Sequence, residues 1–319
     1  MQTFWNSITR PFFCLAPMAD VTDAAFRRVI ATCGKPDVIF NEFVSVEGLM
    51  HPKGREKLLQ DLTYSQIERP IVAQIFGPNP DHYRVVAELL QELGFDGVDI
   101  NFGCPVHAIS KQCAGAELVN YPERAREIVR ATKAGAGKLP VSVKTRLGIK
   151  TDVLESWLPL LLEEEPAAVT IHARTAKEMS HVPARWDRIA RAKEIARERG
   201  SRALIIGNGD VVSLEDGKLK IENWGVDGVM VGRGVFGNPW FFNPTVTRES
   251  LTPRERMRVL LEHAQLFDEL VSHKSFAVMR KHFKAYTHGF ENTGPLRDAL
   301  MQTANSREVA EVMRRFDLL

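Results

Sequence analysis

Short runs of β-branched and aliphatic residues recur along the first three quarters of the chain, and segments with helical periodicity separate them. The apolar runs predict eight strands, at residues 12–17, 37–42, 70–77, 97–102, 140–146, 168–174, 203–209 and 227–234. The segments between them predict helices at residues 23–34, 80–94, 121–135, 154–165 and 186–200. Strands that look buried and that alternate with helices indicate a parallel sheet.

Eight strand–helix units in this length of chain fit a closed (β/α)₈ TIM barrel of the α/β class. A doubly wound open sheet is the alternative, because strand number alone does not prove closure. After Pro244 the pattern becomes helical, with helices predicted at residues 250–271, 275–290 and 306–319. Ser250 or Thr252 is the expected cap of the first, with Pro253 just inside it. We therefore expect a barrel domain at residues 1–244 and a small all-helical domain at 245–319.

Composition and charge narrow the class of protein only slightly. The chain has 319 residues, of which 44% are hydrophobic and 26% charged, as in ordinary globular proteins. It has no bilayer-length apolar run and no secretory signal pattern, so we expect a cytoplasmic protein without a membrane partner. The four cysteines lack CxxC spacing, which argues against a structural zinc site or a disulfide framework. The net charge of +2 arises after residue 244, where 12 basic residues meet 10 acidic ones.

Polar and catalytically useful side chains follow every predicted strand. In a barrel, the strand ends and the loops after them build the active site. The residues at these positions are Pro17, Met18, Glu42, Gln74, Asn101, Cys104, Lys144, Arg146, His172, Arg174, Asn208, Asp210 and Arg233. The sequence therefore predicts one site, rich in amide, cationic and imidazole groups, at one rim of the barrel.

Two glycine-containing segments, at residues 207–210 and 232–234, follow the last two predicted strands. Barrels commonly bind phosphate at this position through exposed backbone N–H groups, and Arg233 would add a cation. Tight turns without a ligand are the simpler alternative. The match of residues 232–237 to a dinucleotide fingerprint is rejected, because no further βαβ unit follows.

Two of three notable strand-end residues have competing interpretations. Lys144 in the barrel mouth would face a polarised carbonyl or an anion, such as a flavin ring that becomes anionic on reduction; it would otherwise form a Schiff base, or pair with Glu42 or Asp99. Gln74 can both donate and accept at the edge of a flavin or pyrimidine. His172 is either a core histidine or a ligand contact.

Cys104 lies in an Asn-Phe-Gly-Cys-Pro turn after the fourth predicted strand. A thiol with an ordinary pKa of about 8.5 is mostly protonated at neutral pH, so it can act as a general acid. Cys14, inside the first predicted strand, is expected in the core.

Seven short motifs occur along the chain in an order and at spacings that are highly specific when taken together. They are Ala-Pro-Met-Ala (16–19), Asn-x-Gly-Cys-Pro (101–105), Val-Lys-Thr-Arg (143–146), Ile-His-Ala-Arg-Thr (171–175), Gly-Asn-Gly-Asp (207–210), Val-Gly-Arg-Gly (231–234) and Asn-Pro-Trp (238–240). From about Leu15 to Tyr286 the chain resembles tRNA-dihydrouridine synthases. The resemblance implies an FMN-binding barrel, a helical tRNA-binding domain, NADPH as electron donor, and no obligate protein partner.

The resemblance also implies roles for individual residues. FMN would be held by Pro17, Met18, Ala19, Gln74, Lys144, His172, Asn208, Gly209, Asp210, Gly232 and Arg233. Cys104 would donate the proton, Asn101 and Arg174 would contact the uracil, and Arg280 and Lys281 would contact tRNA. The implied reaction reduces the 5,6 double bond of specific uridines in tRNA to dihydrouridine, with the base taken out of its stack.

Two other functions fit parts of the chain. An FMN-barrel oxidoreductase acting on a free small molecule, such as dihydroorotate or an enone, would not need the helical domain. A non-catalytic RNA-binding protein would not need Cys104, Lys144 or the two glycine segments. The sequence departs from the family pattern at Ala108, where lysine is common, and at Asp20 and Val182, where glycine is expected.

Overall fold

The strands of the chain close into a barrel. The computed structural model describes residues 3–289 and 293–319, and within them nine strands form one sheet, in the order β2-β1-β9-β8-β7-β6-β5-β4-β3. β2 (Val38–Phe40) also pairs in parallel with β4 (Ile71–Phe76), through Ile39 opposite Ile71, and this pairing closes the sheet. The predicted (β/α)₈ barrel is confirmed, and the open doubly wound sheet is excluded.

The barrel strands coincide with the predicted apolar runs. Besides β2 and β4 they are β1 (Phe12–Leu15), β5 (Gly97–Phe102), β6 (Val141–Arg146), β7 (Ala168–His172), β8 (Leu204–Asn208) and β9 (Gly228–Val231). The additional strand β3 (Val44–Ser45) pairs with the end of β4. The barrel strands are almost wholly buried, because helices cover their outer face and side chains fill the inside.

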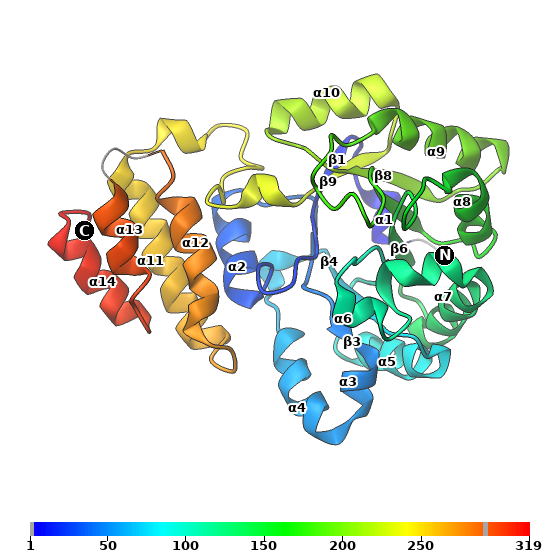
Figure 1. Ribbon diagram of the computed structural model, residues 1–319, viewed down its shortest axis with the longest axis horizontal. Helices are drawn as coiled ribbons and strands as arrows, with labels where there is room; N and C mark the ends of the chain where they lie inside the picture. Colours follow the sequence, from blue (N-terminus) through cyan, green and yellow to red (C-terminus); the bar gives the residue numbers. More distant parts are fainter. Residues whose placement is uncertain (1–2, 290–292) are drawn as a thin grey trace.

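Helices surround this barrel at the predicted positions (Figure 1). They are α2 (Ala24–Cys33), α5 (Pro80–Glu92), α7 (Pro122–Ala136), α8 (Leu154–Leu162) and α9 (Trp186–Glu198). The sequence pattern missed α3 (Val46–Met50), α4 (Pro52–Asp61), α6 (His107–Ser110) and α10 (Leu214–Trp224). α4 buries none of its residues, so it has no apolar stripe from which periodicity could predict it. Short 3₁₀ helices occur at η1 (Gln66–Glu68), η2 (Gly115–Asn120), η3 (Arg233–Val235) and η4 (Arg248–Ser250).

The amino end of the barrel is covered by the short helix α1 (Phe4–Ser7). Its Trp5 is buried against Phe12, with ring centroids 5.7 Å apart. Cys14 is fully buried in the same apolar cluster, as expected for a core residue. The open mouth of the barrel therefore lies at the other end, where the strands finish.

The C-terminal part is helical throughout the residues described, with α11 (Pro253–Leu270), α12 (Arg280–Tyr286), α13 (Thr293–Leu300) and α14 (Ser306–Arg315). α13 was not predicted. The helix predicted at 275–290 begins instead as the 3₁₀ helix η5 (Phe276–Met279), and Phe290 lies outside the described residues. Thr252 caps α11 in a capping box with Glu255.

These C-terminal helices have an apolar cluster of their own. It contains Met257, Phe267 and Phe283 together with Ala24 and Ala25 of α2. The helical region therefore packs onto the barrel through α2, which lies beside α12 in Figure 1. Among the residues described, none of the helices combines the length and apolar composition needed to cross a membrane.

Candidate active site

A cavity of about 530 Å³ opens at the carboxyl ends of the barrel strands. The predicted site residues in its lining are Pro17, Met18, Lys144, His172, Arg174, Asn208, Gly209, Asp210, Gly232 and Arg233. Ala19, Gln74, Asn101 and Cys104 are outside this lining. Asn101 is nevertheless paired with Lys144 across β5 and β6, so its turn begins beside the cavity. The structure thus brings together the ends of strands that are distant in sequence.

The loop after β8 contains two consecutive residues with positive φ. Gly209 has φ +129°, and a Cβ there would approach the Ala184 Cβ to 2.9 Å. Asp210 follows in the left-handed region, at φ +48°. Arg233, after β9, donates to Asp210 over 2.8 Å and keeps 62% of its side chain exposed. Two glycine-containing turns and an available guanidinium can bind a phosphate at this end of the barrel.

His172, at the end of β7, is neutral in this environment. Burial, followed by the positive charges of Arg146 and Lys144, lowers the pKa of the imidazole strongly. Arg174 Nη1 lies 3.1 Å from His172 Nε2. Since a guanidinium can only donate, Nε2 must accept and Nδ1 must carry the proton. The cavity wall therefore contains a neutral N–H donor at physiological pH.

Arg174 is almost completely buried, and it ties together the wall behind His172. Its Nε donates to the Val182 carbonyl over 2.6 Å, and its Nη2 donates to Asp210. Burial opposes ionisation of Asp210, but hydrogen bonds from Arg174 and the Ala184 amide outweigh it and lower the pKa of the carboxyl. Most of the hydrogen-bonding capacity of Arg174 is thus used inside the protein.

Lys144 contributes a partly buried cation to the cavity. Its Nζ donates to Asn208 Oδ1 over 3.2 Å, while Asn208 Nδ2 donates to the Met230 carbonyl. Burial and the charge of Arg146 lower the pKa of Lys144 to about 8, and Asp99 opposes that shift. The amine is therefore mostly protonated at neutral pH, which favours contact with an anion over a Schiff base.

Cys104 lies in a turn that Asn101 holds in place. Asn101 Oδ1 accepts hydrogen bonds from the amides of Gly103 (3.0 Å) and Cys104 (2.9 Å). Cys104 is 8% exposed. Burial raises the pKa of Cys104, and this effect exceeds those of a backbone hydrogen bond and two nearby cations. The thiol therefore keeps its proton at neutral pH, as a general acid must.

A buried chain of hydrogen bonds leads to this turn. Asp99 accepts from Ser142 Oγ and from Gln74 Nε2, both over 2.6 Å. Gln74 Oε1 accepts from Asn101 Nδ2 over 3.0 Å. An ionised carboxylate can accept hydrogen bonds but cannot donate them. Asp99 therefore fixes the orientation of both amides. Gln74 and Asn101 thus have an observed partner inside the protein in addition to any ligand contact predicted for them.

Arg146 is a site residue to which the sequence assigned no role. It lies two residues from Lys144 on β6, and alternate strand residues share a face. Its Nε donates to the Gly103 carbonyl over 2.7 Å and its Nη1 to the Thr175 carbonyl over 3.2 Å. It links the Cys104 turn to the loop after β7. Strand alternation is the signal that could have identified it.

The turn after β1 is held by a local hydrogen-bond network. Met18 N donates to Thr22 Oγ1 over 2.8 Å, and the Met18 carbonyl accepts from the amides of Val21 and Thr22. Pro17 is buried, Met18 half-buried and Ala19 exposed. This turn places Pro17 and Met18 in the cavity wall.

On the helical region, α12 has two distinct sides. Arg280 and Lys281 are exposed, whereas His282 and Tyr286 are fully buried. Lys281 Nζ also donates to the carbonyl of Asp20, on the barrel, over 2.8 Å. The two predicted tRNA contacts therefore lie on the outside of the helix, and one of them already binds the rim of the barrel.

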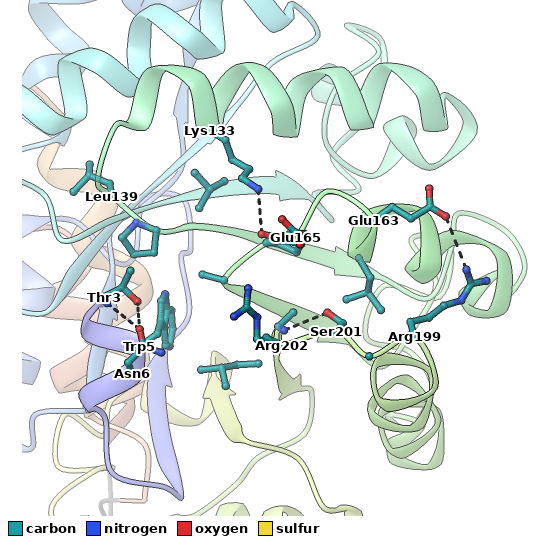
Figure 2. A pocket seen from close by; sticks show the side chains of 18 of the residues that line it. Thr3, Trp5, Asn6, Lys133, Leu139, Glu163, Glu165, Arg199, Ser201 and Arg202 are labelled. Carbon is teal, nitrogen blue, oxygen red and sulfur yellow. Dashed lines mark hydrogen bonds and ion pairs between the residues drawn. The ribbon is translucent and has the colours of Figure 1, made fainter. Parts of the chain in front are cut away.

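A second hollow, of about 730 Å³, lies at the opposite end of the barrel (Figure 2). It is lined by loops and by the first residues of β6 and β8, together with Trp5 of α1. Lys133, in its lining, donates to the Glu164 carbonyl over 2.8 Å and to the Glu165 carbonyl over 3.4 Å. Its lining has no histidine and none of the family motifs that line the first cavity, which is therefore the candidate active site.

A closed barrel with glycine-containing turns after β8 and β9 and a partly buried cation at one mouth is typical of enzymes that bind a phosphorylated cofactor. The model of the family described as dihydrouridine synthase matches residues 14–317. The probable tRNA-dihydrouridine synthase of Staphylococcus aureus (strain COL) is 40% identical, over 99% of this chain and 96% of its own. The probable tRNA-dihydrouridine synthase 2 of Bacillus subtilis (strain 168) is also 40% identical, over 99% and 97%. The chain belongs to the dihydrouridine synthase family.

Solved structures support the fold independently. Morphinone reductase in complex with tetrahydroNAD superposes with a TM-score of 0.50 over 72% of this chain and 84% of its own. Its sequence is only 13% identical, so this similarity concerns the architecture and not the substrate.

Proposed function

We propose that this protein is a flavin-dependent tRNA-dihydrouridine synthase, which uses FMN and NADPH to reduce the 5,6 double bond of specific uridines in tRNA. The observation that carries the proposal is the convergence of the family motifs, from β1, β6, β7, β8 and β9, on one cavity at the barrel mouth. Because tRNA is the substrate, we propose the cytoplasm as the location.

The residues of the cavity fit FMN in both charge and shape. The phosphate would be held by the backbone of Gly209 and Gly232 and by the guanidinium of Arg233. A Cβ at Gly209 would fill the turn, so glycine leaves its backbone accessible. Lys144 would offer its charge to the flavin ring, and neutral His172 would offer its N–H. Pro17, Met18, Ala19, Gln74, Asn208 and Asp210 complete the proposed FMN set. FMN bound there would supply the redox chemistry, namely hydride transfer to C6 of the uracil with electrons that come from NADPH.

Cys104 is the proposed proton donor to C5 of the same uracil. Its raised pKa keeps the thiol protonated, and the Asn101 cap fixes the backbone that carries it. After each turnover the thiolate must recover a proton. Solvent can supply it, because Cys104 remains slightly exposed. We propose that Asn101 and Arg174 contact the uracil, through groups left over from their bonds within the protein.

Residues 245–319 form the proposed tRNA-binding domain, joined to the barrel domain at residues 1–244. Exposed Arg280 and Lys281 would contact phosphates, the type of contact that dominates binding to nucleic acids. A barrel reductase acting on a free small molecule would have no use for this helical region.

The direct test is to purify the protein, record its flavin spectrum, and incubate it with NADPH and tRNA from a strain that lacks this gene. The proposal expects a stoichiometric flavin and dihydrouridine at defined positions of the tRNA. A protein that binds flavin and oxidises NADPH only with a small enone, and leaves tRNA unmodified, would contradict it.

A further inference from the structure

The turn that carries Pro17 and Met18 into the flavin cavity contains a residue in an unfavourable conformation. Asp20 has φ +54°, in the left-handed region. A residue with a Cβ rarely adopts this conformation, which persists where the surroundings hold it. The contacts of Asp20 therefore identify what holds the turn.

The first contact comes from the barrel itself. The Asp20 amide donates to Glu42 Oε2 over 2.8 Å, and the Glu42 amide donates in turn to the Thr22 carbonyl. Glu42 is 4% exposed. A buried carboxylate needs a cation, because its desolvation is costly without one.

That cation comes from the helical region. Lys274, between α11 and η5, places its Nζ 2.5 Å from Glu42 Oε1 and 3.1 Å from Asp61 Oδ1. The same ammonium lies 3.5 Å from the Asp20 carboxylate. Lys274 is itself largely buried, so the group is an ion cluster at the junction of the two regions and not a surface pair.

The second hold on Asp20 is made from α12. Lys281 Nζ donates to the Asp20 carbonyl over 2.8 Å. The backbone N–H of this left-handed residue is thus fixed through Glu42 and Lys274, and its carbonyl is fixed through Lys281. Both lysines belong to the helical region, more than 250 residues along the chain from Asp20.

We propose that Lys274 and Lys281 are positioning residues, through which the helical region holds the Asp20 turn and thereby sets the flavin-contacting groups of Pro17 and Met18. The inference rests on the proposed function, because it concerns the flavin site. It gives the helical region a second role besides RNA contact, and it makes flavin affinity depend on how that region is docked.

The experiment titrates flavin-free protein with FMN and uses Lys281→Ala as the principal variant, because Lys281 is exposed and its loss should leave the fold intact. Removing its hydrogen bond should weaken FMN binding about 3- to 10-fold. Lys284→Ala, an exposed lysine on the same helix, is the matched control and should bind FMN as wild type does. The melting temperature of each flavin-free variant checks that it is folded.

Asp20→Gly supplies the decisive arm. Glycine adopts φ +54° without steric cost, so a glycine turn needs less support. Asp20→Gly combined with Lys281→Ala should therefore bind FMN within about twofold of wild type. Lys274→Met, expected to weaken FMN binding more than Lys281→Ala, tests the Glu42 branch.

The proposal is overturned if Lys281→Ala binds FMN as wild type does, even if tRNA binding falls. It is also overturned if the glycine substitution fails to restore affinity, because Lys281 would then act by a route other than the turn. Neither result would affect the proposed function. A wild-type protein that binds no FMN would overturn both together.

Discussion

Asp99 begins the hydrogen-bond chain that ends at Cys104, and two replacements of it should behave very differently. Asp99→Asn can keep both partners: its oxygen accepts from Gln74, and its amide donates to the Ser142 hydroxyl, which can also accept. Asp99→Leu leaves the buried Gln74 Nε2 without this partner and leaves Ser142 Oγ with only its 3.4 Å hydrogen bond to the Val98 carbonyl. An unsatisfied buried group costs about 1–3 kcal/mol and a lost hydrogen bond about 0.5–1.5 kcal/mol, so the leucine variant should lose about 1.5–4.5 kcal/mol of unfolding free energy.

The asparagine variant should differ from wild type in its pH dependence. Burial raises the pKa of Asp99 to about 6, against hydrogen bonds from Gln74 and Ser142 and the charge of Lys144. Since an unfolded Asp ionises near pH 4, the folded state binds more protons between about pH 4 and 6. The contribution of Asp99 to stability therefore falls as pH rises through that window. Asp99→Asn lacks this fall. From pH 5 to pH 7.5 its free energy of unfolding should therefore rise by about 1 kcal/mol relative to that of wild type.

Urea unfolding at the two pH values measures these free energies, and dihydrouridine formation measures the consequence for Cys104. Asp99→Asn should keep the amide orientations of Gln74 and Asn101 and remain within about threefold of the wild-type rate. Asp99→Leu frees those amides and should lower kcat at least about tenfold, because the donor is misplaced. A leucine variant as stable and active as the asparagine variant would refute the role of this chain.

Three further predictions follow from other parts of the molecule. Arg233→Ala should weaken FMN binding about tenfold, at the low end for a charged hydrogen bond because Arg233 is exposed, whereas Arg202→Ala at the opposite barrel end should not. Arg280→Ala should reduce the slope of log K against log salt for tRNA by about 0.7–0.9 with flavin content unchanged; an unaltered slope would leave Arg280 as ordinary surface. Burial lowers the pKa of His263 to about 3, and it also lowers the pKa of His282. Because both imidazoles stay neutral in the folded state, the protein should lose stability as pH falls below about 6.5, where unfolded histidine takes up a proton. Between pH 7.5 and 5.5 the free energy of unfolding should fall by about 2–3 kcal/mol less in a variant with both histidines replaced by leucine than in wild type. If the free energy of unfolding of this variant depended on pH as that of wild type does, the two histidines would not be neutral in the folded state.

The barrel could be predicted from the sequence because each strand is a short run rich in β-branched and aliphatic residues and each covering helix has an apolar stripe. α4 and α13 could not, since α4 buries no side chain and α13 is a short helix whose role depends on its neighbours. In these cases packing in three dimensions, and not local pattern, determines the structure.

The candidate site could be predicted only as a set of strand ends. Strand order places the ends of β6 to β9 and β1 side by side, so the residues at these strand ends lie on one rim. The sequence could not reveal that Arg174 is buried or that Gln74 joins Asp99 to Asn101, because the register between strands decides both. The contact between Lys281 and Asp20 depends on how the helical region docks, and no local pattern contains that information.

The most direct test of the account is a single-turnover assay of Cys104→Ala with unmodified tRNA. The variant should bind FMN and accept electrons from NADPH as wild type does, because the thiol lies outside the lining of the flavin cavity. It should then form dihydrouridine at a rate lower by about 10²–10⁴, the usual contribution of a general acid. Dihydrouridine formation at the wild-type rate would contradict the assignment of Cys104 as the proton donor.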